Sequence, residues 1–295
     1  MRSERYKMKT KGRVSLVLGS GGARGYAHIG VIEALEKRGY EIVSISGASM
    51  GALIGGLYAC GKLDAYKEWV LGLDPLDVAS LVDFSFDSSG LIKGDKVFDK
   101  IAAMIGEEQT FEDLPIKFTA VATDVVRKKE VWFQSGNLLQ ALRASIAIPT
   151  IFTPVKIDEM ILTDGGTLNP LPVAPTMSDI SDMTIAVNLY GDSPKPEIEI
   201  SDEEKKQTNK LSRVFLELLE KFNPPEEELS MFDILDKTLD TMQNGLTRYR
   251  LGGYPPDILI EISKDVCSTY DFHKALEVIE QGRRAAQKQL DAKGL

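Results

Sequence analysis

Several residue types that mark common classes of protein are scarce in this chain. Only two of its 295 residues are cysteine and only two are histidine. Cys60 and Cys267 lie far apart and in no ligand-like pattern, so we expect neither a disulfide framework nor a metal site. This use of cysteine favours a reducing compartment, and we predict a cytoplasmic protein.

Long apolar runs and net positive charge are missing as well. No apolar run reaches the roughly 18 residues that a membrane-spanning helix needs. The formal net charge of −9 argues against nucleic-acid binding, which requires a basic surface. Residues 1–12 form a basic tail with two interpretations: a solvated end, or a weak electrostatic tether for peripheral contact with the inner membrane surface.

The chain does contain a serine between two glycines at the junction of a strand and a helix. Residues 42–46 are a β-branched run, Gly47-Ala48-Ser49-Met50-Gly51 follows, and small apolar residues continue to about Cys60. Glycines at Gly47 and Gly51 permit a tight turn, which places the Ser49 hydroxyl at a helix N-terminus. The positive end of the helix dipole favours a developing anion there. The pattern predicts a nucleophile, and a structural turn is the alternative.

A second glycine-rich turn follows the first predicted strand at residues 14–18 and precedes a helix at 26–38. Its sequence is Gly19-Ser20-Gly21-Gly22-Ala23-Arg24-Gly25. Gly21 and Gly22 would expose backbone N–H groups that bind an oxyanion, and Arg24 would add a nearby cation. A dinucleotide fingerprint is the competing interpretation, but Arg24 occupies a position that the fingerprint reserves for glycine.

The proton acceptor for Ser49 has more than one candidate. Asp164-Gly165-Gly166 follows a strand-like run at residues 160–163, and an aspartate at a strand end can approach another loop closely. The chain order Ser49, Asp164, His273 would also fit an α/β-hydrolase triad. However, the elbow here follows the second strand, and His273 begins a polar-faced terminal helix where a solvated histidine is expected. His28 lies one turn past the glycine loop and is interpreted as structural.

The order of the elements predicts the fold class and the domains. Strand, helix, strand and helix within the first 60 residues indicate a mostly parallel sheet covered by helices, a three-layer α/β/α sandwich. We expect a catalytic domain at residues 13–192. Residues 193–295 form a mainly helical extension whose late strand, at 257–262, joins the same fold. A predicted helix pair at 203–246 is either core or homodimer packing, or else a lid or membrane-facing element.

The glycine loop, the elbow and the aspartate motif together resemble the patatin-like phospholipase family, which includes cytosolic phospholipase A2. The resemblance covers about residues 13–190, in matching order and spacing, and the small bacterial members are most similar. Arg143-Ala144-Ser145 with Pro149 also looks like a segment that members carry before the aspartate motif. Ser20 departs from the pattern, because many members have the first glycine of the loop there.

The resemblance implies a serine lipid acyl hydrolase of phospholipase A, lysophospholipase or esterase type. Ser49 would attack an acyl ester, such as a phospholipid, and Asp164 would accept its proton without a histidine. Gly21, Gly22 and Arg24 would stabilise the oxyanion, Gly47, Gly51, Gly165 and Gly166 would shape the turns, and no metal or organic cofactor would be required. Two alternatives are a non-catalytic regulator or scaffold on this fold, and a histidine-dependent acyltransferase, although Ala48 occupies the place of that enzyme's usual histidine.

Overall fold

The computed structural model describes residues 10–81, 94–149, 152–192 and 231–295. The predicted basic tail at 1–12 and the first helix of the pair at 203–246 therefore lie largely outside the described residues. The strands are β1 (Gly12–Leu18), β2 (Tyr40–Ala48), β3 (Lys117–Asp124), β4 (Lys129–Phe133), β5 (Val155–Ile157), β6 (Met160–Asp164), β7 (Met183–Gly191) and β8 (Ile258–Ser263).

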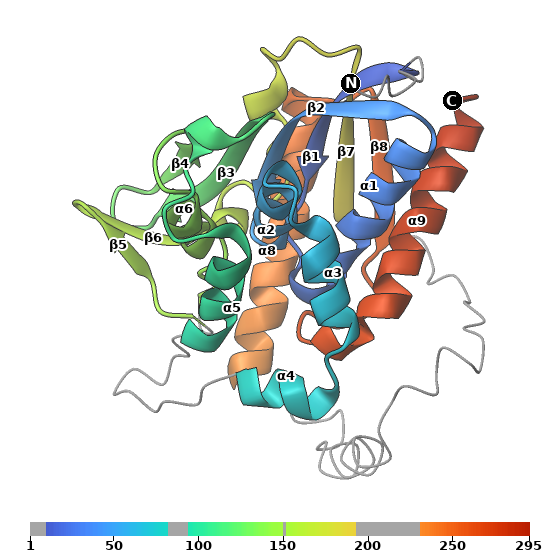
Figure 1. The fold of residues 1–295 in the computed structure, drawn as a ribbon. Coiled ribbons are helices and arrows are strands. Elements are labelled where there is room, and N and C mark those ends of the chain that lie inside the picture. The colour runs from blue at the N-terminus through green and yellow to red at the C-terminus, as the bar shows by residue number, and fades with distance from the viewer. Residues whose placement is uncertain (1–9, 82–93, 150–151, 193–230) are drawn as a thin grey trace, which may run out of the picture.

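These strands form one mixed sheet in the order β5-β6-β3-β2-β1-β7-β8, with β4 paired to β3 (Figure 1). The neighbours from β3 through β2, β1 and β7 to β8 are parallel. The pairs β3/β4, β3/β6 and β5/β6 are antiparallel. The chain moves from β1 to β2 on one side and returns to β7 on the other, so the carboxyl end of β1 lies at a topological switch point, where open α/β sheets bind ligands.

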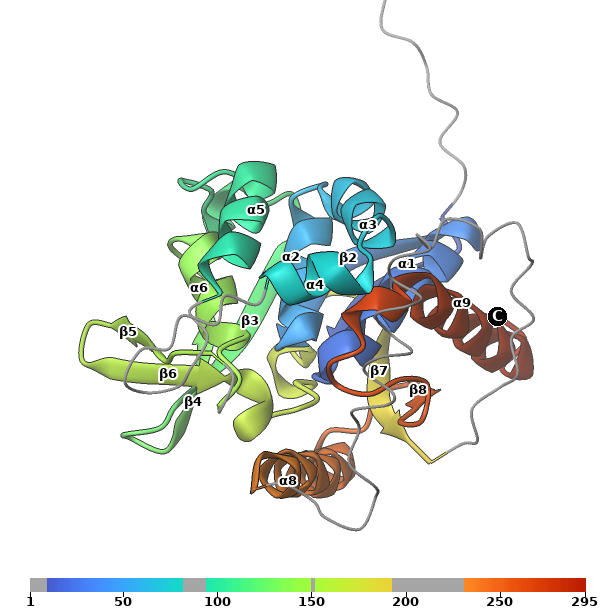
Figure 2. The ribbon, with the colours of Figure 1, turned by 90° about the horizontal axis from the view of Figure 1, so that it is seen from below.

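Helices cover both faces of this sheet. They are α1 (Ala27–Lys37), α2 (Met50–Ala59), α3 (Leu63–Leu71), α4 (Pro75–Leu81), α5 (Asp95–Ile105), α6 (Leu138–Ser145), α8 (Met231–Gly253) and α9 (Ala275–Ala292). Figure 2 shows α1, α2, α3 and α9 on one side of the strands and α8 on the other. The predicted three-layer α/β/α fold is confirmed.

The alternating side chains of β1 explain why both faces need a cover. Leu16 and Leu18 join a large apolar cluster with residues of α1, α2 and α9, whereas Val17 joins a smaller cluster with Leu171 and with Leu251 of α8. Because both faces are buried, every residue from Val14 to Leu18 is buried, and all of them except Ser15 are apolar.

Helix α8 contains the second helix of the pair predicted at 203–246, and part of its apolar face is exposed. The sequence places Leu235, Leu239 and Met242 on one apolar face, but the side chains of Leu235 and Met242 are 41% and 56% exposed. The face that contacts the rest of the molecule carries Asp240 and Gln243 instead. The predicted second helix is therefore present. The choice between core or homodimer packing and a lid or membrane-facing element stays a prediction.

Within the described residues, no helix is both long and apolar enough to span a membrane. Over the same part of the chain, no three His, Cys, Asp or Glu side chains gather in a way that would hold a metal ion.

Candidate active site

Ser49 occupies a strained turn between β2 and α2. Its backbone angles are φ 54° and ψ −127°, a region that residues with side chains seldom adopt, and it precedes the first residue of α2. A Cβ atom at Gly47 would lie 2.5 Å from the carbonyl oxygen of Gly51, and one at Gly51 would lie 2.1 Å from the oxygen of Leu18. The two glycines are therefore required by close packing, and the turn presents Ser49 at the end of the sheet.

Ser145 holds the backbone of this turn from the side. The Ser49 N–H donates to Ser145 Oγ at 3.0 Å, and that hydroxyl donates to the carbonyl of Val121 in β3 at 2.6 Å. Ser145 is fully buried at the end of α6. Sequence reasoning gave it no role, although the segment Arg143-Ala144-Ser145 was part of the family resemblance.

The glycine loop presents two unpaired N–H groups beside Ser49. The N–H groups of Gly19, Ser20, Ala23 and Arg24 all donate to backbone carbonyls. Those of Gly21 and Gly22 have no such partner within the described residues, and both glycines line a cavity together with Ser49. The oxyanion role of these two glycines stays a prediction, and their unpaired N–H groups are the observation that favours it.

The glycine at position 22 meets a further requirement. Its φ is +55°, and a Cβ atom there would lie 2.5 Å from the carbonyl oxygen of Thr269. Both the backbone conformation and the close approach exclude a side chain.

Arg24 braces the loop through several contacts at once. Its Nε donates to the carbonyl of Gly21 at 3.2 Å, and its Nη2 donates to both carboxylate oxygens of Asp240 at 3.1 Å and to Thr269. The guanidinium also lies over the ring of Tyr190, 4.8 Å from its centre. These contacts favour a positioning role, because the guanidinium orients the Gly21 peptide and ties α8 to the loop.

Asp164 ends β6 on the far side of β3 from the elbow. Ala48, the residue before Ser49, pairs with Val121 of β3, and the next residue of β3, Ala122, pairs with Asp164. Ser49 and Asp164 therefore lie at the same end of the sheet, one on each side of β3. Asp164 Oδ1 accepts the Gly166 N–H at 2.7 Å. Oδ2 is buried without a partner at hydrogen-bond distance among the described residues. An orphaned carboxylate oxygen beside a serine is suited to accept a proton.

The glycines of the aspartate motif are also fixed by space. A Cβ atom at Gly165 would lie 2.0 Å from the carbonyl oxygen of Val121, and one at Gly166 would lie 2.7 Å from Ser20 Oγ. Asp164 is thus held against β3 and the glycine loop.

Burial raises the pKa of Asp164 to about 7, and interactions with the Ser49 hydroxyl and the Gly166 N–H counteract only part of that shift. A carboxyl with this pKa is a much better base at neutral pH than a solvated aspartate, whose pKa is about 3.9. The base form is the deprotonated one, so it is lost as pH falls through 7.

We therefore expect kcat/KM for ester hydrolysis to fall about a hundredfold between pH 8 and pH 5, with its midpoint near 7. The measurement is a pH–rate profile for wild type and for His273→Ala. The same limb should be present in both, and its disappearance in His273→Ala would assign the titration to the histidine.

Neither histidine lines the cavities next to Ser49. His28 is fully buried, and its Nε2 lies 2.8 Å from the carbonyl oxygen of Gly19. Burial lowers the pKa of His28 to about 4, so it stays neutral and supports the loop. His273 lies in the short turn before α9, and burial lowers its pKa as well. A histidine-dependent mechanism therefore has no support in this geometry.

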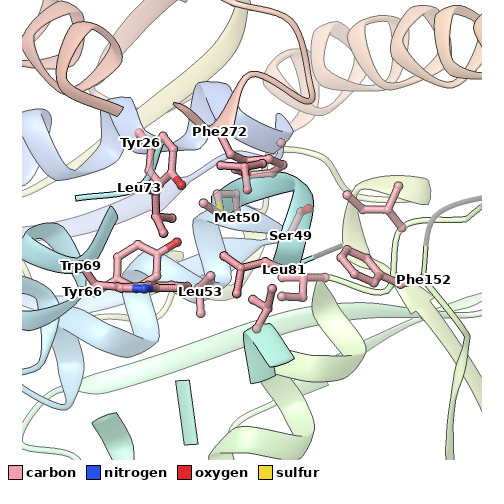
Figure 3. Close-up of a pocket in the computed structure, with 15 residues that line it drawn as sticks. Tyr26, Ser49, Met50, Leu53, Tyr66, Trp69, Leu73, Leu81, Phe152 and Phe272 are labelled. Atoms are coloured by element: carbon pink, nitrogen blue, oxygen red, sulfur yellow. The ribbon is translucent and has the colours of Figure 1, made fainter. Parts of the chain in front are cut away.

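Two cavities meet at Ser49. The larger encloses about 720 Å³, including its part open to solvent, and nearly all its lining is apolar or aromatic (Figure 3). Figure 3 shows Tyr66 and Trp69 at one end and Phe152 at the other, with Ser49 between them. The smaller measures about 420 Å³, including its part open to solvent, and is lined by Ser49, Asp164 and the polar face of α8. An ester bond at Ser49 would have an apolar space on one side and a polar space on the other.

The fold and this site define an α/β protein with a serine in a strained strand-to-helix turn, a glycine loop and a buried aspartate. Residues 16–177 match the family description "Patatin-like phospholipase". The chain is 38% identical to an uncharacterised NTE family protein of Mycobacterium bovis, over 95% of this chain and 92% of that protein. The chain therefore belongs to the patatin-like phospholipase family.

One further relative and one solved structure are less similar to the chain. The lysophospholipase nte1 of Emericella nidulans is 32% identical over 61% of this chain but only 13% of its own length. The crystal structure of VipD from Legionella pneumophila aligns with 95% of this chain and 66% of VipD, with 16% identity and a TM-score of 0.48. Family membership supports lipid hydrolysis at the level of the family as a whole.

Proposed function

We propose that the chain is a serine lipid acyl hydrolase in which Ser49 and Asp164 act as a catalytic dyad. The observation that carries the proposal is the buried Asp164, whose pKa is raised to about 7, beside a strained serine that lines an apolar cavity. A nucleophile, a base and a hydrophobic space for an acyl chain are thus found together.

The reaction has two halves. Ser49 Oγ attacks the ester carbonyl carbon while its proton passes to Asp164 Oδ2, and the Gly21 and Gly22 N–H groups bind the resulting oxyanion. The tetrahedral intermediate then expels the alcohol, which takes the proton from Asp164 and leaves an acyl group on Ser49. Water attacks this acyl-enzyme with Asp164 again as base, which releases the carboxylic acid and restores the serine.

The substrate is an acyl ester with a long chain. The larger cavity presents Met50, Leu53, Trp69 and Phe152 to its contents, and burial of each methylene group contributes about 0.8 kcal/mol. Binding energy therefore grows with chain length until the cavity is full.

The test is hydrolysis of p-nitrophenyl esters across acyl lengths. We expect kcat/KM to rise by up to about fourfold per methylene from acetyl to at least octanoyl, since 0.8 kcal/mol corresponds to that factor. A preference for acetyl, or hydrolysis that persists in Ser49→Ala, would rule out the lipid acyl hydrolase.

A further inference from the structure

The smaller cavity extends from the catalytic pair to α8, and the mechanism assigns no role to the residues at its α8 end. Its polar lining comes from the glycine loop, the aspartate motif, β7, α8 and the segment before α9: Ser20, Asp164, Thr167, Tyr190, Asp240, Gln243 and Thr269. Gly22, Ser49 and Ile148 belong to the linings of both cavities. If the acyl chain fills the apolar cavity, the alcohol half of the ester must enter this one.

Gln243 of α8 is held in one orientation within this cavity. Its Oε1 accepts hydrogen bonds from Ser20 Oγ at 2.9 Å and from the Tyr190 hydroxyl. With the oxygen fixed in this way, the two N–H groups on Nε2 remain as donors, and they have no acceptor among the residues described by the structure. A side-chain amide with a fixed oxygen and available donors is suited to bind a hydroxyl oxygen of a ligand.

The charge of the lining favours an uncharged ligand. Asp164 and Asp240 both border the cavity, and a phosphate placed there would lie beside the carboxyl group of Asp164. Both oxygens of Asp240 are already bonded to Arg24, which offsets the carboxylate and leaves it little attraction for a cationic amine. The remaining groups are hydroxyls and the Gln243 amide, which pair best with alcohol groups.

We propose that this cavity is the subsite for the alcohol half of the substrate, that it accepts a neutral polyhydroxy alcohol of the glycerol type, and that Gln243 determines this preference. The inference rests on the proposed function and names its substrate class. A hydroxyl of the glycerol unit accepts a hydrogen bond from Gln243 Nε2 while the ester carbonyl lies at Ser49. Monoacylglycerols are therefore better substrates than lysophospholipids with the same acyl chain.

The first test compares substrates that differ only in the alcohol. 1-Oleoylglycerol, 1-oleoyl lysophosphatidic acid and 1-oleoyl lysophosphatidylcholine are supplied at equal mole fraction in neutral detergent micelles. We expect kcat/KM for the monoacylglycerol to exceed that for either lysophospholipid by at least about tenfold. An equal or higher value for a lysophospholipid would overturn the subsite, and the proposed function would stand if that hydrolysis were lost in Ser49→Ala.

The second test changes Gln243 itself. Gln243→Met keeps the length of the side chain but removes both the acceptor and the donors, and Gln243→Glu keeps an oxygen for Ser20 and Tyr190 but removes the donors. In both variants we expect KM for the monoacylglycerol to rise about tenfold, the scale of one lost hydrogen bond. The ratio of its kcat/KM to that for p-nitrophenyl oleate should fall by a similar factor.

Thr241→Ala, on the exposed side of the same helix, is the matched control and should leave that ratio unchanged. If the Gln243 variants lower kcat for the monoacylglycerol and for p-nitrophenyl oleate equally, the ratio of the two kcat/KM values does not change. Gln243 would then support the glycine loop without binding the alcohol half of the substrate, and the proposal would be overturned. Absence of Ser49-dependent hydrolysis of every ester would instead reject the proposed function.

Discussion

Ester hydrolysis should fall by about 10⁴-fold or more when Ser49 is replaced by alanine. The proposed mechanism passes through a covalent acyl group on Ser49 Oγ, and no other atom of the turn can replace that oxygen. The expected loss is in kcat, because the apolar cavity and its affinity for the acyl chain remain. The measurement is steady-state hydrolysis of p-nitrophenyl octanoate by purified wild type and variant.

Ser46→Ala is the matched control for that loss. Ser46 is a fully buried serine of β2, only three residues before Ser49, and its hydroxyl has no hydrogen-bond partner among the described residues. Its removal should leave kcat within about threefold of wild type, since nothing in the mechanism uses it. An equal loss in both variants would indicate damage to the elbow and not removal of a nucleophile.

Asp164→Asn should lower kcat by about 10³-fold or more while making the protein more stable at neutral pH. Asparagine keeps an oxygen for the Gly166 N–H but cannot accept the serine proton. General-base removal alone costs about 10²–10⁴-fold. The carboxyl serves both halves of the proposed reaction, which places the expected loss at the upper end.

The stability effect follows from the raised pKa. The pKa of Asp164 is about 7 when folded, against about 3.9 in an unfolded chain, so the unfolded state loses its proton first as pH rises. Wild type therefore loses stability between pH 4 and pH 7, on the order of 2 to 4 kcal/mol, and Asp164→Asn does not. The Tm of the variant should exceed that of wild type by several degrees at pH 8, and the difference should vanish near pH 4.

Asp158→Asn is the control for both the rate and the Tm of Asp164→Asn. Asp158 lies in the turn between β5 and β6 with φ 50°, a conformation that asparagine also tolerates. Its rate and its Tm should follow wild type at every pH. A near-wild-type rate in Asp164→Asn would contradict the dyad whatever its Tm.

The sequence predicts the scaffold well because local signals agree with one another. The apolar residues of β1 and the β-branched run of β2 predict two strands, and the glycines around Ser49 predict a tight turn after the second. The structure bears out all three. The strand-like run at 160–163 and the late strand at 257–262 also match β6 and β8.

The contacts that cross between distant segments are not visible in the sequence. Ser145 binds the Ser49 N–H from 96 residues away, and no local pattern marks that hydroxyl. The polar face of α8 appears only when Asp240 meets Arg24 and Gln243 meets Tyr190, since polar residues on a helix are otherwise expected in solvent. Side chains from several helices line the apolar cavity, and no sequence pattern indicates that these helices pack around one space.

The central claim is that Asp164, and no histidine, activates Ser49. The most direct test is the rate at which a fluorophosphonate labels the protein, with the modified residue located by mass spectrometry of peptides. The account predicts one label per chain on Ser49 in wild type and in His273→Ala at similar rates, and labelling at least about a hundredfold slower in Asp164→Asn. A label on another residue, or slow labelling in His273→Ala with fast labelling in Asp164→Asn, would contradict it.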